Sequence, residues 1–142
     1  MVFKFLWGEG GERLAGVESK VQEMLAHDRR EFDLAMSALL GDVAAREVNE
    51  ELRATDRKVN QLEREIRREL VVHASVFGGI DSPSVLVYMS VVKDIERVGD
   101  YAKNLLDLAR DGASFAGVAD EAEWRRLAGE ISAFIADSGA AF

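Results

Sequence analysis

The sequence predicts an all-α fold, an antiparallel three-helix bundle of long helices followed by a fourth, C-terminal helix. The 142 residues include a single proline and are rich in Ala, Leu, Glu and Arg, which favour helix. Apolar residues recur at steps of three and four over long stretches, and no segment shows the Val, Ile and Thr alternation of a half-buried strand. Short glycine-containing connections separate these stretches, so the helices should lie antiparallel.

The first two helices are predicted over residues 12–40 and from residue 42 or soon after. Gly41 ends the first helix, and Gly78-Gly79 end the second. The second helix is charged on its outer surface, and its apolar positions mostly alternate in steps of four and three, as in helix bundles. This seam consists of Val48, Leu52, Thr55, Val59, Leu62, Ile66 and Leu70.

The third helix is predicted to begin at Ser82-Pro83, with Ser82 as the capping side chain and Pro83 at the first helical position. It should end at Asp111-Gly112. Its predicted buried side consists of Met89, Val92, Ile95, Val98, Ala102, Leu105 and Ala109.

The fourth helix follows a loop that extends to Ala119. Asp120 and Glu123 have the spacing of a capping box, and the amphipathic pattern after them continues to Phe142. The apolar spacing in this helix echoes that of the first helix, which indicates the beginning of a second repeat.

Composition excludes several functional classes. A net charge of −8 opposes nucleic-acid binding, and the absence of cysteine excludes disulfides and thiolate sites. No segment is long and apolar enough to span a membrane. The aromatic N-terminal arm, residues 1–11, is expected to dock on the chain's own core, with a second subunit or a membrane surface as alternatives.

An acidic stripe on the third helix is the main candidate site. Glu96, Asp100 and Asn104 follow one another at four-residue steps, and Asp107 comes three further on. These side chains share one helix face and offer the oxygen ligands that hard cations and iron accept. A solvated helix surface is the alternative. Gly99 within the stripe indicates close approach by a neighbouring backbone or a ligand.

Three segments together resemble the PhoU phosphate-uptake regulators. They are residues 42–48 (DVAAREV), 56–66 (DRKVNQLEREI) and 95–104 (IERVGDYAKN). The resemblance covers roughly residues 12–112, a PhoU-like three-helix repeat, and residues 113–142 would be a loop and the opening helix of a second, truncated repeat. The third segment, which places Gly-Asp after Glu-Arg, is the most specific of the three.

The resemblance implies a cytoplasmic, usually dimeric regulator of phosphate transport and phosphate-responsive signalling that catalyses no reaction. Its partners would be the ATPase subunit of a phosphate ABC transporter or a sensor histidine kinase, at the inner face of the membrane. Family members bind metal clusters through acidic residues on the second and third helices. Carried over, these positions are Glu96, Asp100, Asp56 and Asn60, with Fe, Zn, Mn, Mg or Ca as candidate ions.

Asn60 departs from the acidic residue that many family members have at this position, so the metal site would carry less negative charge. Asn104 and Asp107 are further candidate ligands. No motif of a catalytic site occurs in the sequence, and neither His27 nor His73 is assigned a role. The alternative function is a metal-binding or structural helical protein without a role in phosphate signalling.

Overall fold

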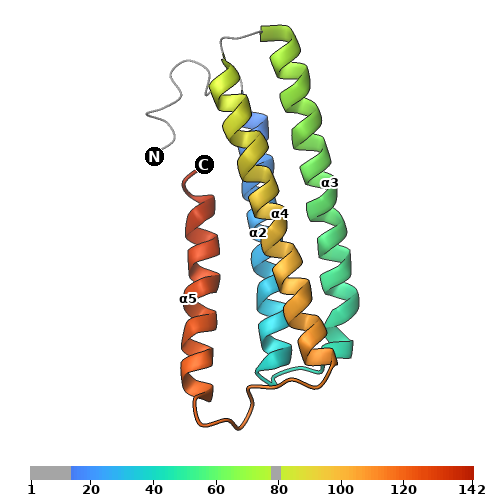
Figure 1. Ribbon diagram of the computed structural model, residues 1–142, viewed down its shortest axis with the longest axis vertical. Helices are drawn as coiled ribbons and strands as arrows, with labels where there is room; N and C mark the ends of the chain where they lie inside the picture. The colour runs from blue at the N-terminus through green and yellow to red at the C-terminus, as the bar shows by residue number, and fades with distance from the viewer. Residues whose placement is uncertain (1–13, 78–80) are drawn as a thin grey trace.

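The computed structural model describes residues 14–77 and 81–142, which form four α-helices and no strand. These are α2 (Ala15–Leu39), α3 (Ala45–Phe77), α4 (Ser82–Arg110) and α5 (Glu121–Gly139). The predicted all-α bundle is confirmed (Figure 1). The aromatic arm, the predicted helix start at Glu12 and the predicted stop at Gly78-Gly79 lie outside the described residues.

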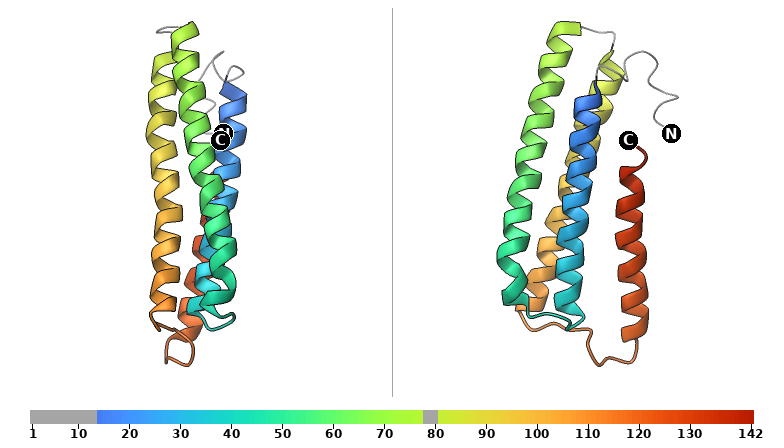
Figure 2. Two further views of the ribbon diagram at one scale, coloured as in Figure 1. Left: turned by 90° about the vertical axis from the view of Figure 1, so that its right-hand side faces the viewer. Right: turned by 180° about the vertical axis from the view of Figure 1, so that it is seen from behind.

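Helix α2 is the central element of the bundle. α3 and α4 pack against one side of it, and α5 packs against another (Figure 2). This position follows from the sequence of α2, because a helix that is apolar over much of its circumference must be covered by several neighbours. Its buried residues are Val17, Val21, Met24, Leu25, Asp28, Glu31, Phe32, Leu34, Ala35, Met36, Ala38 and Leu39.

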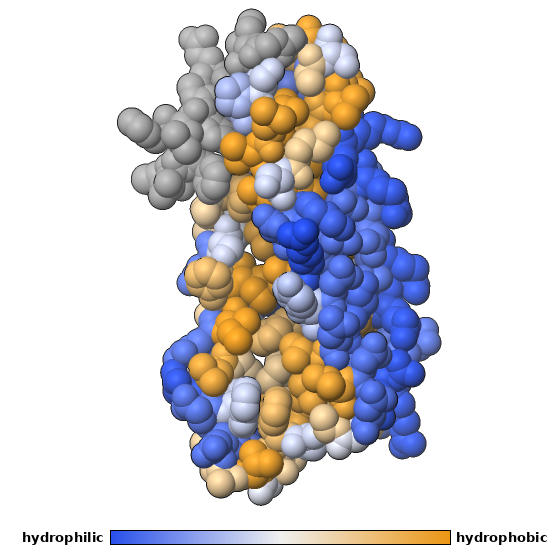
Figure 3. Space-filling view, viewed as in Figure 1, coloured by the Kyte–Doolittle hydropathy of each residue, from blue (hydrophilic) through white to orange (hydrophobic). Residues whose placement is uncertain are grey.

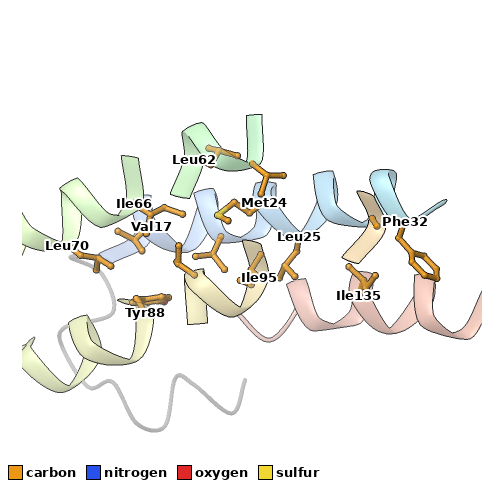
Figure 4. Packing of buried hydrophobic residues seen from close by; sticks show 14 of the residues in the cluster. Val17, Met24, Leu25, Phe32, Leu62, Ile66, Leu70, Tyr88, Ile95 and Ile135 are labelled. Atoms are coloured by element: carbon orange, nitrogen blue, oxygen red, sulfur yellow. The ribbon is translucent and has the colours of Figure 1, made fainter. Parts of the chain in front are cut away.

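The predicted seam of α3 is confirmed at every position. All seven seam residues are buried, and His73 extends the seam by one further step. Leu62, Ile66 and Leu70 meet Val17 and Met24 of α2 in the main core (Figure 4). The outer face of α3 is polar, as its charged sequence predicts (Figure 3).

The buried face of α4 differs from the prediction in part. Val92, Ile95 and Ala102 are buried as expected, but Gly99 and Leu106 are also fully covered. Met89, Val98, Leu105 and Ala109 are only half-buried, packed against the edge of the core. The helix is rotated so that Gly99, which has no side chain, faces α2 directly.

Two predicted helix caps are wrong. Ser82 is the first residue of α4 and Asp81 occupies the cap position, but its carboxylate lies 2.8 Å from Nε2 of His73 instead of capping the helix. Asp120 stands at the cap of α5 without a side-chain cap bond, and Glu123 accepts hydrogen bonds from Arg126. In both cases an ion pair or charge-assisted bond takes the carboxylate away from the weaker capping interaction.

Only part of the apolar surface of α5 is buried by the rest of the bundle. Ser132 and Ile135 are buried against α2, where Arg29 donates a hydrogen bond of 2.9 Å to Ser132. Ile131 and Phe134 of α5 are 46% and 74% exposed. Apolar side chains also gather along the face of the molecule that Figure 3 shows. In the described part of the chain, no helix is both long and apolar enough to cross a bilayer.

Candidate metal centre

A lysine joins two of the predicted ligand residues across the α3–α4 interface. Nζ of Lys103 lies 2.7 Å from Oδ1 of Asp56 on α3 and 2.7 Å from Oδ1 of Asp100, one turn earlier on α4. The three side chains are partly buried. Asp56 and Asp100 therefore face the same small volume, and the single positive charge of Lys103 offsets part of their negative charge there.

Two further carboxylates lie behind this triad in the interior of the bundle. Asp28 and Glu31 of α2 are fully buried, and none of their four oxygens has a hydrogen-bond partner. A Cβ atom added to Gly99 would lie 3.0 Å from Oδ1 of Asp28 and 3.3 Å from Oε2 of Glu31. Gly99 therefore provides the space into which both carboxylates point.

The electrostatics of this region follow from its burial and its acidic composition. Desolvation raises the pKa of Asp28 to about 8, with further contributions from Glu31, Glu96, Asp56 and Asp100. Desolvation likewise raises the pKa of Glu31 to about 8, and the charge of Asp56 adds to it. The five carboxyl groups therefore interact as one acidic cluster.

The surrounding carboxylates favour the charged form of Lys103, whereas they favour the neutral forms of Asp28 and Glu31. Its partial burial disfavours the ammonium form, but hydrogen bonds to Asp100 and Asp56 outweigh that effect and raise the pKa of Lys103 above its usual value. Lys103 is therefore a permanent cation at the mouth of the cluster. It does not reach the orphaned oxygens of Asp28 and Glu31.

The remaining predicted ligands occupy different surroundings. Glu96 is paired with Lys93 at 2.6 Å, and Nδ2 of Asn60 donates to the backbone carbonyl of Asp56 at 2.9 Å. Asn104 is exposed, and Asp107 is exposed and paired with Arg110 at 2.9 Å. The structure thus brings Asp56, Glu96 and Asp100 into one cluster, whereas Asn104 and Asp107 extend away along α4.

Sequence reasoning missed Asp28 and Glu31, although a signal for them exists. The residues Val21, Met24, Asp28, Glu31 and Ala35 follow one another at steps of three, four, three and four. An apolar seam with this spacing faces a neighbouring helix, so the two acids within it had to be buried. A search restricted to apolar residues passes over them.

The donor set of the cluster suits a hard cation. All of its ligand atoms are carboxylate oxygens, the type that Mg²⁺, Mn²⁺, Ca²⁺ and iron accept. The orphaned oxygens of Asp28 and Glu31 are an independent observation in favour of a cation, because unpartnered buried carboxylates are costly. As placed, no three acidic or histidine side chains within residues 14–77 and 81–142 are close enough together to hold a metal ion.

Comparison with known protein families identifies the family to which this chain is related. The model of the PhoU domain matches residues 21–109, more than half of the chain and the whole of the acidic cluster. The chain belongs to the PhoU domain family. The expected resemblance is thereby confirmed, and the helical bundle is the fold of a PhoU domain.

A curated relative supports the PhoU assignment. Over 52 residues the chain is 40% identical to a protein of Thermotoga maritima named phosphate-specific transport system accessory protein PhoU homolog 1. The match spans 37% of this chain and 22% of that relative. The search of solved structures found no significant match.

Proposed function

We propose that this chain regulates phosphate transport and phosphate-responsive signalling as a helical adaptor in the cytoplasm. The observation that carries the proposal is the PhoU domain match over residues 21–109, and the name of the Thermotoga maritima relative supports it. The chain would act by contact with a protein partner and would catalyse no reaction. The partner would be the ATPase subunit of a phosphate ABC transporter or a sensor histidine kinase.

The proposal includes a metal ion at the α3–α4 interface. Asp56 and Asp100 would hold it, and Glu96 and Asn60 would complete the site after small movements from their present partners. The bound ion would supply a compact positive charge that holds α3 against α4. In its absence Lys103 performs this role, because its ammonium bridges the same two carboxylates.

Lys103 and a metal ion would therefore exclude each other. A cation that bound Asp56 and Asp100 would have to displace the ammonium, since two positive charges at this separation repel strongly. The displaced lysine would then extend toward solvent. Metal binding would thus change both the charge and the shape of the α3–α4 surface, which is what an adaptor needs in order to present two states to a partner.

We further propose that the chain associates with a second copy through α5. Trp124, Leu127, Ile131 and Phe134 form a seam with steps of three, four and three, a pattern that suits packing against another helix. Leu127, Ile131 and Phe134 have the same spacing as Val17, Val21 and Met24 of α2. These three residues of α2 are 0–3% exposed under α3 and α4. Within residues 14–77 and 81–142, no helix covers Ile131 and Phe134 of α5 in the same way, and they are 46% and 74% exposed.

The experiment that tests the adaptor proposal is a direct binding measurement. The purified chain would be titrated with a purified phosphate-transporter ATPase subunit and, separately, with a phosphate-sensing histidine kinase, each with EDTA and with Mn²⁺. We expect binding to at least one partner and an affinity that changes with Mn²⁺. The variant Asp56→Asn/Asp100→Asn should lose the Mn²⁺ effect.

The alternative function is a metal-binding or structural helical protein without a role in phosphate signalling. This alternative makes no demand on Mn²⁺ binding, but it predicts no affinity for either partner under any condition. Absence of partner binding, together with unchanged activity of a phosphate-starvation reporter in a deletion strain, would establish it.

A further inference from the structure

We infer that Asp28 and Glu31 form a second cation site, inside the bundle between α2 and α4, in the space that Gly99 leaves open. This site is separate from the proposed site at Asp56 and Asp100 and belongs to a different helix pair. Its ligand would be a hard divalent cation of the Mg²⁺ or Mn²⁺ type.

The first argument is the state of the carboxylates. Both side chains are 0% exposed, and all four oxygens lack any hydrogen-bond partner. A buried polar group without a partner costs about 1–3 kcal/mol, and more when it is charged. Two such groups on neighbouring turns of one helix are therefore expected only where something outside the protein chain satisfies them.

Protonation does not supply everything that these oxygens lack. A protonated carboxyl keeps an oxygen that can only accept a hydrogen bond, and the described residues place no donor within hydrogen-bond distance of any of the four oxygens. Lys103 is committed to Asp56 and Asp100 at 2.7 Å each and does not reach inward. A cation that contacts both carboxylates would supply the partner that their oxygens lack.

The geometry around Gly99 supports a shared ligand. A single point, the position of a Cβ on residue 99, lies 3.0 Å from Oδ1 of Asp28 and 3.3 Å from Oε2 of Glu31. The two oxygens therefore lie against the same face of Gly99. An ion held by both would lie beside this point rather than on it, because a Cβ position is only one bond from the Cα of the glycine, and its bonds to the two oxygens would be about 2.0–2.6 Å long.

Two carboxylates are enough for an ion of this class. Mg²⁺ keeps several water ligands and is commonly held by one or two carboxylates, unlike zinc in a closed four-ligand site. The charges of Asp56, Glu96 and Asp100 add negative potential at Asp28. The site thus needs no third protein ligand, in agreement with the absence of any three-residue metal group among the described residues.

The test uses isosteric variants of the whole chain. Wild type, Asp28→Asn/Glu31→Gln and Asp56→Asn/Asp100→Asn would be stripped with EDTA and titrated with Mn²⁺ by calorimetry. A ¹⁵N NMR spectrum of each would record which amides Mn²⁺ broadens. We expect two Mn²⁺ sites in the wild type. The broadening centred on Gly99 and the middle of α2 should be retained in the Asp56/Asp100 variant and lost in the Asp28/Glu31 variant, which should keep only the interface site.

The outcomes separate this inference from the site proposed at Asp56 and Asp100. Loss of Mn²⁺ binding only in the Asp56/Asp100 variant would overturn the interior site and leave the interface site standing, and the reverse result would do the opposite. No Mn²⁺ binding to wild type would overturn both. Because Asn and Gln preserve the size of the side chains, circular dichroism and the NMR spectrum would verify that each variant is folded.

Gly99→Ala provides a second, independent variant. Its methyl group would occupy the point on which the two oxygens converge, so Mn²⁺ affinity at the interior site should fall by about tenfold or more. Gly129→Ala is the matched control, because a Cβ on Gly129 would meet no atom within 4 Å. Equal Mn²⁺ affinity in the two variants would contradict the interior site.

Discussion

The ammonium of Lys103 lies 2.7 Å from Oδ1 of Asp56 and so joins the third helix of the bundle to the second. Because the same ammonium also contacts Asp100, one lysine is shared by two carboxylates on different helices and offsets one of their two negative charges. A positive charge is therefore required at this point of the α3–α4 interface, whether a side chain or an ion supplies it.

Lys103→Met should make the metal-free protein less stable and increase its affinity for metal. The substitution leaves Asp56 and Asp100 facing each other without a cation, at a cost of about 1–2 kcal/mol for a partly exposed pair. Urea unfolding with EDTA measures the loss, and added Mn²⁺ should restore it. Lys58→Met, at an exposed position of α3, is the control and should change neither quantity.

Gly99→Ala should destabilise the chain although alanine is the better helix former. The new methyl group would lie 3.0 Å from Oδ1 of Asp28, and this crowding should exceed the gain in helix propensity of about 0.5–1 kcal/mol. Asp28→Ala should relieve the clash, so a double-mutant cycle should give a coupling energy of about 1 kcal/mol or more. Additive effects would show that Gly99 and Asp28 are not in contact.

Stability of the metal-free protein should fall as pH rises from about 5 to about 8. The pKa values of Asp28 and Glu31 are raised to about 8 in the folded state, whereas the unfolded chain loses these protons near pH 4. Within this window the folded state holds more protons, so each acid lowers stability by on the order of 1 kcal/mol per pH unit. Asp28→Asn/Glu31→Gln should flatten the profile, and an unchanged profile would show that both acids titrate normally.

Phe134→Glu should prevent self-association without affecting the fold. Phe134 is 74% exposed in the apolar seam of α5, and a charge there would have to be desolvated in the proposed interface. Sedimentation velocity over a range of concentrations should show a dimer for wild type and a monomer for the variant. Ala133→Glu, at an exposed position outside the seam, should remain dimeric. A monomeric wild type would contradict self-association through α5.

The sequence was sufficient to predict the helices because their apolar periodicity is strong. The seam from Val48 to Leu70 is buried at every predicted position, and Gly41 adopts the positive φ of 77° that ends α2. The caps at Ser82 and Asp120 were not predictable in the same way. Asp81 lies 2.8 Å from Nε2 of His73, and Glu123 accepts hydrogen bonds from Arg126. The cap spacing alone does not show that a carboxylate has such a competing partner.

Only part of the candidate site was predicted, because spacing along the chain does not show which residues of different helices meet. Asp56 and Asp100 lie 44 positions apart in sequence, and only the resemblance to a family placed them together. Asp28 and Glu31 were not predicted because acidic residues are ordinarily expected at the solvent-exposed surface. Their heptad spacing within the seam of α2, rather than their residue type, is what indicates burial.

The polar layer in the middle of α2 also restricts how the helices can slide past one another. Along α4, Gly99 is flanked one turn away by Ile95 and Lys103, and neither could face two buried carboxylates as closely as a glycine does. A shift of α2 by one turn would press Asp28 or Glu31 against a full side chain, whereas an entirely apolar seam would tolerate that slip. The acids and the glycine together therefore specify a single alignment of the two helices.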